Sequence, residues 1–89
     1  MKRTIDLSSV ETLDELHARL RKALRLSEEY GCNLDALHDV LTESIEPRTL
    51  VFKNGTAFWT RFPDFFPRLV QVFLNSQDET EGLDVTFLP

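Results

Sequence analysis

The stretch NLDALHDVLTESIEPRTLVF, residues 33–52, has a helix pattern followed by a strand pattern. Asn33 is a favourable N-cap and Pro47 stops the helix, which we expect to run from about Leu34 to Ser44. Successive helical residues are about 100° apart, so apolar and polar side chains separate onto two arcs. The apolar arc, which we assign to the core, contains Leu34, Leu37, Val40, Leu41 and Ile45.

The opposite arc of this helix is polar and acidic. It contains Asp35, His38, Asp39, Thr42 and Glu43, with no Lys or Arg to compensate the carboxylates. Residues 27–47 as a whole have no Lys or Arg, but they contain six acids: Glu28, Glu29, Asp35, Asp39, Glu43 and Glu46. Like charges one turn apart destabilise a helix, so this arc favours a partner that supplies cations. An ordinary solvated helix face is the alternative interpretation.

The sequence before this stretch predicts a strand, a helix and a tight connection. Residues 4–7 are β-capable. Thr12 and Glu15 form a capping box that opens an amphipathic helix over residues 13–25, with His17 at the edge of its apolar arc. In the connection over residues 26–33, we expect Gly31 to adopt a backbone conformation that other residues resist.

The sequence from residue 49 onward predicts a strand, two helical segments and a last strand. Residues 49–52 indicate a buried strand, Asn54-Gly55 a turn, and residues 57–62 a short helical turn within an aromatic cluster. Pro67 opens a helix that ends near Gln77, a polar turn covers residues 78–82, and residues 83–88 form a last strand.

The order of these elements determines the fold class. Strands that are separated by helices usually lie parallel in one sheet, with right-handed crossovers. The sequence therefore predicts one α/β domain over residues 1–89, with a three-stranded parallel sheet packed with helices.

Composition limits the compartment and the partners. Ten Lys and Arg stand against 15 Asp and Glu, a net charge of −5, which argues against nucleic acid and anionic membrane as partners. No apolar run approaches the roughly 18 residues of a membrane span. Asp6 falls where a signal peptide would need its hydrophobic stretch, and the single cysteine, Cys32, fits a reducing compartment. We expect a cytoplasmic protein, with monomer as the default state.

Catalytic and metal sites find little support in the residue pattern. Cys32 and His38 have no second ligand pair, so we expect no metal and no cofactor. Asp35 and Asp39 are one helical turn apart, with His38 between them, but a convex helix face lacks the pocket that an acid–base pair needs. We therefore expect no enzyme.

The run from Tyr30 to Asp39 resembles the signature of the barstar family, intracellular inhibitors of secreted guanyl-specific ribonucleases. The family pattern is Tyr-Gly-x-Asn-Leu-Asp-Ala-Leu-x-Asp, and the sequence matches it at every specified position. The resemblance extends to the start of the first helix and to Glu-Gly-x-Asp-Val-Thr at residues 81–86. It implies a barstar-like parallel sheet with packed helices, as predicted above.

The resemblance also implies a binding mode. In that family the second helix and the loop before it plug the active-site groove of the ribonuclease in a one-to-one complex. The carboxylate of Asp39 would occupy the pocket for the scissile phosphate, with Asp35 in support. The residues implied as lining the contact are Tyr30, Gly31, Asn33, Leu34 and Thr42.

Four positions depart from the family. Glu29, His38 and Glu43 stand where the family has an aromatic residue, a tryptophan and a glycine, and Asn75 stands where it has an acid. We expect Glu29, His38 and Glu43 in the contact surface. The departures leave three partners open, namely a related microbial ribonuclease, a ribonuclease-type toxin domain, or a different basic protein or toxin bound through the same acidic helix by an immunity module.

Overall fold

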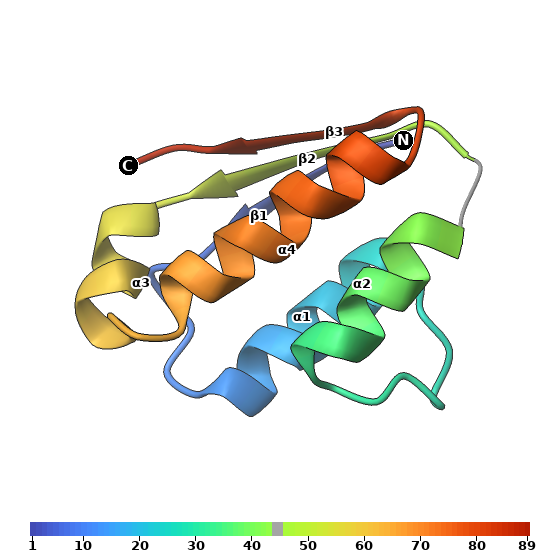
Figure 1. Ribbon diagram of the computed structural model, residues 1–89. Coiled ribbons are helices and arrows are strands. Elements are labelled where there is room, and N and C mark those ends of the chain that lie inside the picture. Colours follow the sequence, from blue (N-terminus) through green and yellow to red (C-terminus); the bar gives the residue numbers. More distant parts are fainter. Residues whose placement is uncertain (44–45) are drawn as a thin grey trace.

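The computed structural model describes residues 1–43 and 46–89 and has two layers, a sheet and a set of helices (Figure 1). Strands β1 (Lys2–Asp6), β2 (Arg48–Lys53) and β3 (Leu83–Phe87) pair in parallel in the order β1-β2-β3. Phe52 lies opposite Ile5 on one side and Phe87 on the other. The predicted α/β class with a three-stranded parallel sheet is confirmed.

The described residues form four helices: α1 (Leu13–Leu24), α2 (Leu34–Glu43), α3 (Gly55–Arg61) and α4 (Phe66–Glu79). On one side of the sheet, α4 packs against β3 and α1 against β1, and α2 packs on α4 (Figure 1). The strands alternate accordingly, because Ile5 is buried while Thr4 and Asp6 are exposed. None of the described helices has the length and apolar character that crossing a bilayer requires.

The core explains how α2 is oriented. Phe52 stacks on Phe87 at a centroid distance of 4.7 Å and packs against Phe73 at 5.1 Å. Leu37 and Leu41 of α2 are fully buried, which contributes about 1.5–3 kcal/mol for each side chain. Burial of this arc, as the periodicity predicts, turns the opposite arc of α2 outward. Ser44 and Ile45, which the sequence placed in the helix and its apolar arc, lie outside the described residues.

Several boundaries differ from the predicted ones. Asn54 adopts a left-handed conformation, with φ of 61°, and α3 begins directly after it, so the Asn54-Gly55 signal marks the start of a helix. Helix α1 ends at Leu24, one residue early, because Arg25 takes the left-handed C-cap position. Helix α4 continues to Glu79, two residues past the predicted end.

The aromatic cluster is mostly internal. Phe58 is fully buried and contacts Phe62 and Phe66, with centroid distances of 4.9 and 5.8 Å. Trp59, one residue further along α3, is 52% exposed.

Candidate partner-binding surface

The exposed arc of α2 presents a line of carboxylates that we call the acidic row: Asp35, Asp39 and Glu43. All three are exposed, and their spacing of four residues places them about one turn apart. Within residues 1–43 and 46–89, none of these carboxylates has a hydrogen bond or an ion pair. The three carboxylates therefore repel one another along the helix, and their oxygens are available to accept hydrogen bonds.

Asn33 holds the end of the loop before α2 with both ends of its side-chain amide. Asn33 Oδ1 accepts a hydrogen bond from the Ala36 amide at 2.8 Å, while its Nδ2 donates to the Gly31 carbonyl at 3.2 Å. The first bond caps the helix as predicted, and the second closes the loop onto it. Asn33 itself is exposed, as are Glu29 and Gly31.

The prediction that Gly31 adopts an unusual backbone conformation is wrong. The left-handed residue of the loop is Cys32, with φ of 52°, and Gly31 has no positive φ. Glycine is favoured at position 31 for space, because an added Cβ would lie 3.2 Å from the Cβ of Ala36. The loop therefore packs closely on the first turn of α2.

Tyr30 anchors the loop to the core of the domain. Its ring is buried, and its hydroxyl lies 2.8 Å from Nδ1 of His17 on α1. Burial lowers the pKa of His17 and raises the pKa of Tyr30, so both groups are neutral near pH 7. His17 is more deeply buried than the boundary position that the sequence indicated. The ring of Tyr30 supports the surface from inside.

One flank of the acidic row is tied to α4. The half-buried His38 has its Nε2 at 2.7 Å from Oε2 of Glu79. Thr42 donates its hydroxyl to the His38 carbonyl at 2.9 Å, and Thr80 Oγ1 donates to the Thr42 carbonyl at 3.4 Å. His38 and Thr42 thus border the row while facing the neighbouring helix. Glu79 is 41 residues away in sequence from His38, so no local pattern indicated this contact.

A cation from β2 lies at the C-terminal end of α2. The last turn of α2 has no basic residue, although cations stabilise helix C-termini. Arg48 of β2, which is buried, donates from Nη2 to the Leu41 carbonyl at 2.6 Å. Burial lowers the pKa of Arg48, and the charge of Glu46 opposes that shift. The sequence pattern of α2 does not indicate this contact, because Arg48 follows the proline that stops the helix.

The predicted contact residues differ in exposure, and Tyr30 is buried. Exposed on the loop and helix are Glu29, Gly31, Asn33, Asp35, Asp39 and Glu43, and partly buried beside them are Leu34, His38 and Thr42. Across the described part of the chain, no group of three or more His, Cys, Asp or Glu side chains is arranged to hold a metal ion. The exposed part of this surface thus presents carboxylate oxygens that can accept hydrogen bonds.

Two comparisons place this arrangement among known proteins. The family described as "Barstar (barnase inhibitor)" matches residues 1–88. A protein of Bacillus subtilis (strain 168) named "Putative ribonuclease inhibitor YrdF" is 36% identical over 76 residues, which cover 84% of this chain and 84% of that protein. With the signature at residues 30–39 and the parallel sheet, these matches show that the chain belongs to the barstar family.

Proposed function

We propose that this protein is a ribonuclease inhibitor that binds a microbial guanyl-specific ribonuclease, or a ribonuclease-type toxin domain, one to one. Helix α2 and the loop before it cover the active site of the nuclease, and the inhibitor acts in the cytoplasm by binding, without catalysis. The observation that carries the proposal is the acidic row, whose carboxylates are exposed and unpaired among the described residues.

The chemistry of the target explains why carboxylates suit this task. A ribonuclease must hold the scissile phosphate with cationic side chains that stabilise its developing charge. A carboxylate presents two oxygens in a plane and accepts short, often bidentate hydrogen bonds from arginine. Asp39, at the centre of the row, takes the place of the phosphate, while Asp35 and Glu43 lie one turn to either side.

The loop adds affinity by being ordered before binding. The two Asn33 hydrogen bonds and the Tyr30–His17 contact fix the backbone that leads into α2. Binding therefore avoids part of the entropy that ordering a flexible loop would cost. We expect a buried area of about 1,600 Å² in total, the usual size of a stable enzyme–inhibitor interface.

The contact of His38 with Glu79 favours a second candidate. In this chain the imidazole of His38 lies 2.7 Å from Glu79 of the neighbouring helix, at the position where the resemblance to the family implies a tryptophan. A partner matched to that change is a different basic protein or toxin, bound by an immunity module through the same acidic row.

A titration separates the two candidates. The residual activity of several small guanyl-specific ribonucleases is measured against increasing wild-type protein, Asp39→Ala and, as a matched control, Asp84→Ala. Asp84 is exposed on β3 and directly follows the buried Leu83, so the alternation of the strand turns it away from the core. Stoichiometric inhibition that is weakened in Asp39→Ala but not in Asp84→Ala supports the proposal. No inhibition across the panel would refute it and favour the second candidate.

A further inference from the structure

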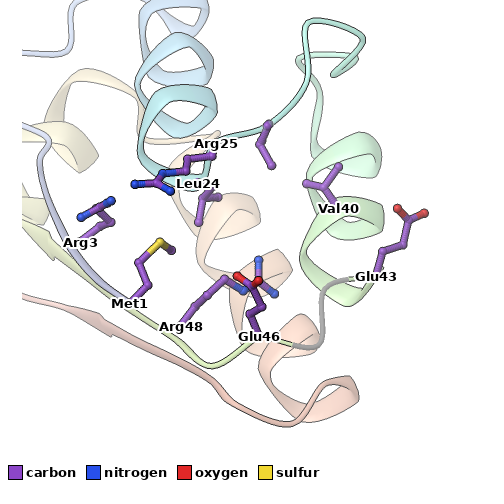
Figure 2. A pocket seen from close by; sticks show the side chains of 9 residues that line it. Met1, Arg3, Leu24, Arg25, Val40, Glu43, Glu46 and Arg48 are labelled. Atoms are coloured by element: carbon purple, nitrogen blue, oxygen red, sulfur yellow. The ribbon is translucent and has the colours of Figure 1, made fainter.

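A pocket of about 540 Å³ opens where the C-terminal ends of α1 and α2 meet the beginnings of β1 and β2 (Figure 2). Its volume falls in the range of about 300–1,000 Å³ that is typical of small-ligand sites. It borders the acidic row only at Glu43, and the proposed function leaves it unused.

Three arginines from three different elements line this pocket: Arg3 of β1, Arg25 at the end of α1 and Arg48 of β2. In Figure 2 the guanidinium group of Arg25 points toward Arg3. Among the described residues, the side chains of Arg3 and Arg25 have no hydrogen bond or ion pair. Neighbouring cations repel one another, so an anion between them would be stabilised.

Two further observations indicate that the cationic lining is built into the fold. Arg25 occupies the left-handed C-cap of α1, with φ of 54°, a position that usually takes glycine. Arg48 is only 6% exposed, and its Nε has no hydrogen-bond partner among the residues that the structure describes. A buried guanidinium N–H without a partner is costly and is uncommon in proteins.

The acids in the wall do not neutralise Arg3 and Arg25. Glu46 lies beside Arg48 and acts on its charge, whereas the carboxylate of Glu43 points away from the arginines (Figure 2). The rest of the wall is apolar and consists of Leu24, Leu26, Val40 and the side chain of Met1. The pocket thus has a cationic part and an apolar part.

We propose that this pocket binds a small organic phosphate, with the phosphate held between Arg3 and Arg25 and an apolar or aromatic body against Leu24, Leu26 and Val40. Guanidinium groups suit the several oxygens of a phosphate because each can donate two parallel hydrogen bonds. None of the residues proposed to hold the phosphate or its organic body belongs to the acidic row, so the site can be tested without a ribonuclease.

The test follows amide signals of the full-length ¹⁵N-labelled protein by NMR during titration with phenyl phosphate at low salt. We expect saturable shifts confined to the amides around the pocket, and weaker binding of inorganic phosphate, which lacks the apolar body. The double variant Arg3→Gln/Arg25→Gln should bind at least about tenfold more weakly, because it loses charge-assisted hydrogen bonds. Arg21→Gln, an exposed position on α1 outside the pocket, should bind like the wild type.

Three results would overturn the proposal: the absence of saturable shifts, equal weakening in Arg21→Gln, or benzoate binding as tightly as phenyl phosphate. A thermal melt of each variant checks that it is folded. Because Arg3 and Arg25 lie outside the acidic row, the double variant should still inhibit a ribonuclease that the wild type inhibits. Failure of this site and failure of the proposed function therefore give different results.

Discussion

Replacing Tyr30 by Phe removes one hydroxyl from the anchor beneath the binding loop and leaves the buried ring in place. The hydroxyl lies 2.8 Å from Nδ1 of His17, and both side chains are buried. The variant loses the hydrogen bond and leaves a buried imidazole nitrogen without its partner. Together these effects should lower the free energy of unfolding by about 1–3 kcal/mol.

The same anchor predicts how stability depends on pH. Burial lowers the pKa of native His17 below the unfolded value of 6.5, so the unfolded state binds more protons in this range. The free energy of unfolding should therefore fall as the pH falls below 6.5, until the lowered native pKa is reached. One proton gives a slope of at most about 1.4 kcal/mol per pH unit. In His17→Gln this component should be absent.

Urea unfolding followed by far-ultraviolet circular dichroism, at pH 7.5 and at pH 5.5, measures both effects. Thr60→Val is the matched control, because it removes a hydroxyl that is bonded at an exposed position, to the Thr56 carbonyl. If Tyr30→Phe were no less stable than Thr60→Val, the Tyr30–His17 bond would not support the loop. If His17→Gln kept the wild-type pH slope, the slope would arise from other groups.

Three further predictions concern the loop and the end of β1. Asn33→Ala loses the helix cap and should lower the free energy of unfolding by about 1 kcal/mol, measured by urea unfolding. In Gly31→Ala the new Cβ would lie 3.2 Å from the Cβ of Ala36, so the loop should shift and ribonuclease inhibition should weaken while the melting temperature changes little. The hydrogen bond from Asn54 is the main cause of the lowered pKa of Asp6, which is about 2. The ionised carboxylate therefore adds to the free energy of unfolding above pH 3.8, and this contribution is lost as the pH falls toward 2. Asn54→Ala should raise that pKa toward 3.8 in an NMR titration, and an unchanged value would contradict this cause.

The sequence predicts the fold well wherever a local pattern is sufficient. The periodicity of residues 34–43 separates buried Leu37 and Leu41 from exposed Asp35 and Asp39, because burial of one helix face needs only that spacing. The strand patterns similarly predict the parallel sheet. The backbone at position 31 differs from the prediction, because glycine is needed there for close packing on Ala36 and has no positive φ.

The contacts that other elements make with α2 could not be predicted, because they come from segments that are distant in sequence. Glu79 reaches His38 across 41 residues, and Arg48 reaches the end of α2 from the strand that follows it. No spacing rule within α2 indicates either contact.

The most direct test of the central claim is the dissociation constant of the complex between an inhibited guanyl-specific ribonuclease and wild-type protein, Asp39→Asn or Asp84→Asn. Asparagine keeps the shape of the side chain and removes the charge that would pair with the nuclease cations. Leaving such cations buried and unpaired costs about 3–5 kcal/mol, which weakens binding by roughly two to three and a half orders of magnitude. We predict that loss for Asp39→Asn and wild-type affinity for Asp84→Asn. Equal affinities for the two variants would contradict the assignment of Asp39 to the phosphate pocket.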